Sequence, residues 1–323
     1  MSQNSIRRAG LLAALALTIG PTLASAQDVP PIPSPATLVE EVEVIARLPG
    51  PALWRVSTPT SQIWFFGLPG TGLPRDFKWN DQRVATALDG ARELVLPPVA
   101  SGGFGDLVSL LLDPGHIIHL PSGQTVRTSL PADLRARWED AARAVGQDPA
   151  HYDHWRPVIA ALAMMQDAGK KVRLDPSGGR AQLMALSRKL HVKGRVVAGY
   201  RAMDLIKGLA DTPEAASQAC LALAADVAQA PKDDTLKAAE AWARGDIAAV
   251  RARNDRSAEC LGAVPEVVRL RDRVAVDSAK DLKEELARPG KAVVAADLDT
   301  LTRKGGLLDQ MKAEGLEVIG PAY

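Results

Sequence analysis

Apolar and aromatic residues gather in short runs near both ends of the chain, and longer helical patterns lie between them. Residues 53–56 and 63–66 are rich in aromatic and β-branched residues, and a polar turn separates them, which is typical of two strands. The second run ends at Gly67, and the loop that follows is too rich in Gly and Pro to continue a strand. Aromatic residues are scarce in the chain, so we expect the core to form around Trp54, Trp64, Phe65 and Phe66.

The rest of the pattern predicts mostly helices, with strands returning at the end of the chain. From 212 to 288 the pattern is almost wholly helical, with Thr212 as a cap, Pro213 at the first helical position, and breaks at 231–233 and 245–246. The sequence therefore predicts a helix-rich α/β fold, with a central sheet built from N- and C-terminal strands and a large helical middle region. The other predicted elements are helices over 79–88, 106–112, 130–145 capped by Ser129, 157–170, 178–190 and 306–314, strands over 93–96, 195–198, 292–296 and 316–319, a loop over 101–105 and a hairpin over 117–126.

Composition sets the size of the core and excludes one class of partner. The chain has 323 residues, of which 46% are hydrophobic, enough for one large or two small packed domains. Its formal net charge is +1, so nucleic acid is not an expected partner.

Residues 1–26 have the pattern of a secretory signal peptide. Arg7 and Arg8 precede an apolar core over 9–19, and Ala24, Ser25 and Ala26 form a small-x-small cleavage site. The mature chain would begin at Gln27 and lie in the periplasm or be secreted. The alternative is a membrane anchor, although the apolar run is shorter than the ~20 residues of a spanning helix, so we expect no membrane span after cleavage. Residues 27–51 are a Pro-rich linker before a single domain over 52–323.

Export changes the interpretation of the two cysteines, Cys220 and Cys260. In an oxidising compartment a pair of cysteines is most simply one disulfide. Two buried free thiols are the alternative. The C-x-x-C spacing of redox enzymes is absent, so thiol–disulfide catalysis is not indicated.

Several short motifs occur in an order that resembles one known family. Leu-Trp-Arg-Val stands at 53–56, Arg-Pro at 156–157, Arg-Leu-Asp at 173–175, Arg-Asn at 253–254 and Gly-Leu-Leu at 306–308. Together with the strand at 93–96 and the C-terminal strand, helix and strand, they resemble the TraB/GumN family, which is related to the Tiki proteins and the EreA/ChaN-like group. The resemblance implies metal-dependent hydrolysis, argued best for the Tiki proteins as a peptidase.

The positions that carry this chemistry differ in the present chain. The family uses two Gly-x-x-His motifs and a glutamate after the strand that follows the first motif, so that imidazoles and a carboxylate hold a divalent ion. Here the first motif begins at Gly67, and Gly70 stands at the position of its histidine. Pro97 stands at the glutamate position. Thr300 stands at the second histidine position. A further family acid is missing near Gly199 and Tyr200.

Three other sets of residues could carry chemistry. Two histidine pairs, His116 with His119 and His151 with His154, could in principle hold a metal. Positions three apart on a short strand face opposite sides, which argues against the first pair. Surface and capping roles are the alternative for both pairs. Asp297 and Asp299 are two apart and would share one face at a strand end, where they could bind a cation or act as acid and base; solvated loop carboxylates are the alternative.

We therefore expect an exported member of this fold group that lacks hydrolase activity and uses no cofactor or metal. Its predicted role is binding or scaffolding in the cell envelope, through the former catalytic cleft or the helical surface, with an envelope protein or a peptide as partner. The rival hypothesis is a metal-dependent hydrolase or peptidase of the Tiki type with relocated catalytic groups around Asp297, Asp299, Arg253 and Arg55.

Overall fold

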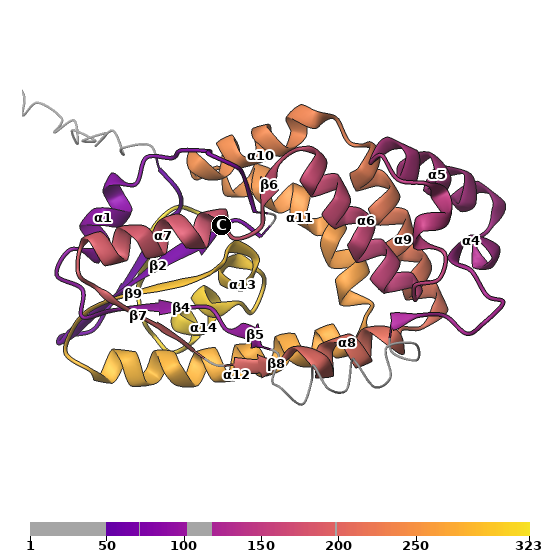
Figure 1. The fold of residues 1–323 in the computed structure, drawn as a ribbon. Helices are drawn as coiled ribbons and strands as arrows, with labels where there is room; N and C mark the ends of the chain where they lie inside the picture. The colour runs from indigo at the N-terminus through magenta and orange to yellow at the C-terminus, as the bar shows by residue number, and fades with distance from the viewer. Residues whose placement is uncertain (1–49, 71, 102–117, 198) are drawn as a thin grey trace, which may run out of the picture. The chain divides into compact units, whose positions relative to one another are not determined.

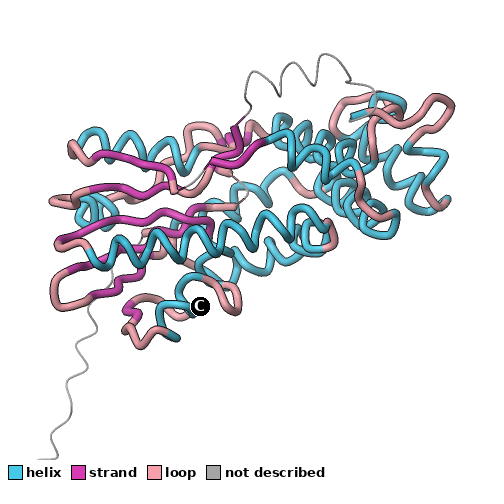
Figure 2. The backbone as a smooth tube through the Cα atoms, turned by 90° about the horizontal axis from the view of Figure 1, so that it is seen from below, coloured by secondary structure: helices cyan, strands magenta, loops and turns pink. Residues whose placement is uncertain are grey.

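Six strands form the main sheet in the computed structural model, which describes residues 50–70, 72–101, 118–197 and 199–323. The order across the sheet is β10 (Val318–Ile319), β1 (Leu53–Ser57), β2 (Ser61–Leu68), β9 (Gly290–Asp297), β4 (Glu93–Leu96) and β7 (Lys193–Val196). Strand β1 is antiparallel to its neighbours β10 and β2, whereas β2, β9, β4 and β7 are parallel to one another. Figure 2 shows the strands of the sheet side by side. The predicted α/β fold with a sheet from both ends of the chain is confirmed.

The sheet is buried because helices cover both of its faces, as parallel strands require. Figure 1 shows α1 (Gln82–Leu88) and α7 (Gly178–Lys189) on one face and α12 (Pro265–Ala287) and α14 (Leu307–Ala313) on the other. The predicted aromatic core is confirmed for Trp54, Phe65 and Phe66, which are fully buried. Trp64 is only half-buried: its ring lies under the guanidinium of Arg55, and its Nε1 donates to Gln62.

A second core lies among the helices of the middle region. Trp138, Tyr152 and Met164 are fully buried in it, and the rings of Trp138 and Tyr152 meet edge to face at 5.6 Å. The helices of this region and of the connection to the sheet are α4 (Val126–Ser129), α5 (Ala132–Ala144), the 3₁₀ helix η1 (Pro149–Tyr152), α6 (Pro157–Lys171), α8 (Ala202–Ala210), α9 (Glu214–Gln229), α10 (Lys232–Ala243) and α11 (Ile247–Gly262).

One tryptophan of the helical region belongs to the core of the sheet. The indole Nε1 of Trp242, in α10, donates a 2.8 Å hydrogen bond to the carbonyl of Gly67 near the end of β2. Its ring also packs against Phe66 and Trp79, at centroid distances of 6.1 and 5.5 Å. This buried bond between distant parts of the chain fixes the end of β2 next to the helices.

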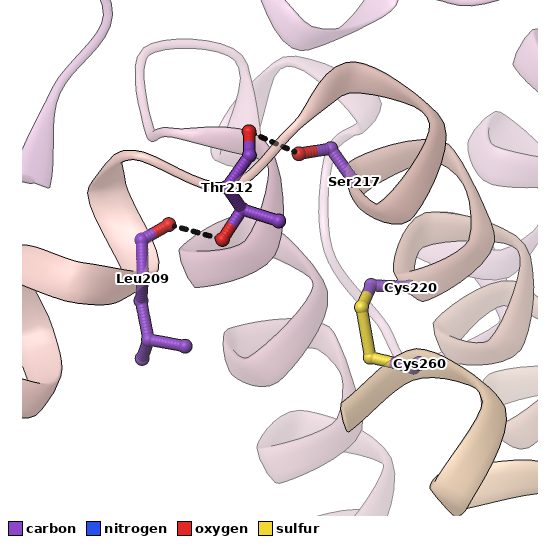
Figure 3. The surroundings of a disulfide bond; sticks show 5 residues. All are labelled: Leu209, Thr212, Ser217, Cys220 and Cys260. Carbon is purple, nitrogen blue, oxygen red and sulfur yellow. Dashed lines mark hydrogen bonds between the residues drawn. A yellow bond between two sulfur atoms is a disulfide. The ribbon is translucent and has the colours of Figure 1, made fainter. Parts of the chain in front are cut away.

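The Cys220–Cys260 disulfide is present, with Cα atoms 4.6 Å apart, and it joins α9 to α11 (Figure 3). Cys260 lies in the last turn of α11, because that helix continues to Gly262. Thr212, the predicted cap of this helical region, does not cap α9 with its side chain. Its Oγ1 donates to the carbonyl of Leu209 at the end of α8, and Pro213 is the cap residue of α9.

Other predicted boundaries were wrong for local reasons. The hairpin over 117–126 is absent from its described part, since His119 instead forms a bridge with Trp155. Ser129 belongs to α4, where its Oγ donates to Val126, and Pro131 is the cap residue of α5. The helix predicted from residue 79 begins at Gln82. The strand predicted over 195–198 corresponds to β7, which begins earlier, at Lys193, and ends at Val196. The predicted helix over 106–112 and nearly all of the loop over 101–105 lie outside the described residues.

The sequence pattern gave no signal for several short elements. They are the strands β3 (Leu73–Pro74), β5 (Val99–Ser101), β6 (Leu174–Asp175) and β8 (Gly199–Arg201), and the helix α13 (Leu298–Thr302) that directly follows β9. Helix α13 overturns the prediction that Asp297 and Asp299 share one face of a strand end, because Asp297 is the N-cap residue of α13 and Asp299 lies in its first turn.

Candidate functional site

A cavity of about 390 Å³ opens at the carboxyl ends of the parallel strands β9 and β4. Pro97 follows β4 and Asp297 ends β9, and both line this cavity. In open α/β sheets the carboxyl edge is where loops and helix starts converge, so side chains from separate parts of the chain meet there.

Three of the four positions assigned by the family resemblance lie on this cavity. Gly70, Pro97 and Thr300 all line it, although they are far apart in the sequence. Gly70 is held by the turn that leads to β3, where Gly72 has a φ of +76° and stands so close to Asp175 that a Cβ would lie 2.6 Å from its carbonyl oxygen. Gly67 does not line the cavity; it pairs with Ala296 inside the sheet.

The two carboxylates of α13 line the same cavity and have no hydrogen-bond or ion-pair partner for their side chains in the described part of the chain. Asp297 makes no capping bond to α13 despite its N-cap position. Asp297 lines the cavity but is itself exposed to solvent. Partial loss of solvation raises the pKa of Asp297, the charge of Asp299 raises it further, and Arg180 opposes both.

One wall of the cavity is the N-terminal half of α12. Val267, Leu270 and Val274 lie three or four positions apart, so they share one face of the helix. All three are half-buried and line the cavity. Arg271 lies on the same face and adds a guanidinium group to the lining. The sequence pattern predicted a helix in this region, and the spacing of these apolar residues was the available signal for the wall, but it was not assigned to a site.

An ion-pair network fixes the other half of α12 to the sheet. Arg195 of β7 donates to both carboxylate oxygens of Asp281, at 2.6 and 2.8 Å, and to Glu285 at 2.7 Å. Asp281 also lines the cavity, so its charge is matched before any ligand arrives. The other members of the network are Glu93, Arg92 and Arg288.

The remaining candidates do not meet at this cavity. Arg55 lies on β1, with its guanidinium 5.7 Å from the centroid of Trp64, and is not among the lining residues. Arg253 is in α11, but its side chain is outside the described part. The Tyr200 hydroxyl donates to Asp277 at 2.6 Å; burial and this bond raise the pKa of Tyr200 to about 12.

The histidine pairs are also separate from the cavity. His151, in η1, packs its ring against Tyr152 at 4.9 Å and Trp155 at 5.8 Å. His119 and His154 are away from the cavity lining, and His116 lies outside the described residues.

The model of the TraB/PrgY/gumN family matches the sequence from residue 52 to residue 319, which is most of the chain. The chain belongs to this family. The resemblance drawn from the motifs is thereby confirmed. No curated protein and no solved structure matches the chain. In the part of this TraB/PrgY/gumN protein that the structure describes, no helix is both long and apolar enough to cross a membrane.

The residues on the cavity do not fit the metal that the family resemblance implies. Gly70 has no ligand atom, Pro97 offers only a backbone carbonyl, and Thr300 offers a neutral hydroxyl. Among the described residues, no three His, Cys, Asp or Glu side chains converge as a metal site requires. Asp297 and Asp299 supply carboxylates alone, without the imidazoles that zinc sites of this type use.

Proposed function

We propose that this TraB/PrgY/gumN protein is an exported binding protein, whose cleft at the carboxyl edge of the sheet holds a ligand without metal-dependent hydrolysis. One observation carries the proposal: Gly70, Pro97 and Thr300 line a single cavity, and none of them brings a side chain suited to a catalytic metal. Without a metal to lower the pKa of bound water, the hydrolysis expected of the family has no nucleophile at neutral pH.

The cavity has the properties of a ligand site in other respects. Its volume of about 390 Å³ lies in the usual range for small-molecule sites. Its wall is an apolar helix face, and the ion pairs of Asp281 and Glu285 to Arg195 hold that helix against the sheet. A preformed apolar cleft with few polar groups favours binding, because little has to be ordered when the ligand enters.

Helix α12 offers a matched pair of substitutions that tests this binding role. Val274 lines the cavity, whereas Val276, two positions later, is 68% exposed on another face of the same helix. We expect the neutral dye Nile red to bind the wild-type protein saturably, with a fluorescence increase. Val274→Trp should fill the cleft and weaken dye binding by about tenfold or more, since a bulky ring takes the space of the ligand.

Val276→Trp serves as the control and should leave dye binding unchanged. Circular dichroism of both variants shows whether the fold is kept. Equal dye binding by the two tryptophan variants would place the dye elsewhere and contradict the proposal.

Export is the second part of the proposal, and it is supported by the basic start, apolar core and Ala24-Ser25-Ala26 site of the sequence. The partner class that follows is an envelope protein or a peptide, in the periplasm or outside the cell. Intact mass of the protein from an envelope fraction should give an N-terminus at Gln27. A full-length cytosolic species as the main product would contradict export.

The rival function is hydrolysis by relocated groups, and the position of both Asp297 and Asp299 on the cavity is the observation that favours it. Two neighbouring carboxyl groups in one cleft could act as an acid and a base. Arg55 is not among the residues that line the cavity, so it does not assist them there. Peptide hydrolysis by the purified protein that disappears in Asp297→Asn would favour this rival.

A further inference from the structure

Three unpaired charges line the cleft, and they come from two different walls. Asp297 and Asp299 belong to the start of α13, and Arg271 belongs to α12. In the described part of the chain, none of the three side chains makes a hydrogen bond or an ion pair within 4.0 Å. The fourth charged lining residue, Asp281, is already matched by Arg195.

Among the residues that the structure describes, the charged residues around the cleft do not pair directly with these three side chains. Arg180 of α7 attracts Asp297 from a distance, but its Nη1 is directed to the carbonyl of Pro97 at 3.5 Å. Arg303, just after α13, is attracted by Asp299 and repelled by Arg271; burial and Arg271 lower the pKa of Arg303. Two neighbouring carboxylates and two neighbouring guanidinium groups are therefore present, and Asp272 adds a more distant negative charge.

The apolar part of the lining lies with these charges in the same cavity. Val267, Leu270 and Val274 come from α12, and Val294 and Leu307 come from β9 and the start of α14. A neutral apolar ligand, such as the dye, can use only the apolar wall; where it covers the carboxylates and Arg271 it replaces none of their contacts to water, so it should bind more weakly than a ligand that also satisfies these charges. A simple cation would satisfy only the carboxylates, and a simple anion would satisfy only Arg271.

We infer that the ligand of this cleft is a small zwitterion with an apolar body, such as an apolar amino acid or a short apolar peptide. Its ammonium group would lie at Asp297 and Asp299, its carboxylate at Arg271, and its apolar side chains against the α12 wall. The inference rests on the proposed function and adds the chemical class of the ligand to it.

Calorimetric titration with a matched set of dipeptides tests the inference. The probes are leucyl-leucine, its N-acetyl form, which lacks the ammonium, and its C-terminal amide, which lacks the carboxylate. Leucyl-leucine should bind, and each blocked form should bind about tenfold more weakly or worse, because each has lost one charge-assisted contact. Free leucine, titrated in parallel, distinguishes an amino acid ligand from a peptide.

Two substitutions assign the two contacts. Asp297→Asn should remove the preference for the free ammonium, and Arg271→Gln should remove the preference for the free carboxylate. Arg273→Gln is the control, since Arg273 lies in the same helix but faces Tyr200 and Glu266, outside the cavity lining; it should bind like the wild-type protein.

The outcomes separate this inference from the proposed function. Equal affinity for the three dipeptides would contradict the zwitterionic ligand but not the binding role of the cleft. The same conclusion would follow if leucyl-leucine did not bind while Nile red still bound at Val274. Failure of both leucyl-leucine and the dye would overturn the two together.

Discussion

At the scale of single residues, Asp297 is the group whose ionisation opposes the folded state. Its pKa is raised by lost solvation and by Asp299, so the folded protein keeps this proton to higher pH than the unfolded chain does. Its favourable contribution is therefore present below the ordinary value of 3.8 and is lost as pH rises through the raised value. Asp297→Asn should increase the melting temperature at pH 7, and the increase should disappear as the pH falls towards 3.8.

Asp309 provides a control, because its pKa is shifted in the direction opposite to that of Asp297. The backbone N–H of Gly305 and the hydroxyl of Tyr323 donate to its carboxylate, which lowers the pKa of Asp309. Its stabilising effect is present at neutral pH and is lost as pH falls, so Asp309→Asn should lower the melting temperature at pH 7. If both variants shift the melting temperature in the same direction at every pH, the account of Asp297 is wrong.

At the scale of elements, the disulfide between α9 and α11 constrains the helical core covalently. Both cysteines are buried in that core, and the bond closes a loop between positions 40 residues apart. In the chain-entropy model such a loop contributes about 3–4 kcal/mol. Replacing both cysteines by alanine should lower the free energy of unfolding by about that amount, measured by denaturant titration. Two free thiols in denatured, unreduced wild-type protein would contradict the bond.

At the scale of the whole molecule, the sequence predicts the sheet better than the site. Aromatic and β-branched runs at 53–56 and 63–66, and the apolar run before Asp297, have few alternatives to strands, and the strands of the main sheet form there. The lining of the cleft depends on tertiary placement. No local pattern shows that Arg271 and Val274 of α12 face the end of β9, or that the chain turns into α13 at Asp297.

The positions assigned by the family resemblance were easier to predict than the rest of the cleft but harder than the strands. Gly70, Pro97 and Thr300 are separated by long stretches of sequence, and only the motif order linked them before the cavity brought them together. Trp242 could not be placed in advance, because its bond to Gly67 joins positions 175 residues apart. Such contacts are set by packing rather than by propensity.

Our central proposal is that the cleft holds no catalytic metal, and the metal content of the purified protein tests it most directly. Protein purified gently, without chelators, would be analysed for zinc, manganese and cobalt by plasma mass spectrometry, and its peptidase activity would be assayed with and without each metal. We expect clearly sub-stoichiometric metal and no metal-stimulated peptidase activity, because the lining residues that the structure describes offer no imidazole. One bound metal ion per chain that is lost in the Asp297→Asn, Asp299→Asn double variant would contradict it.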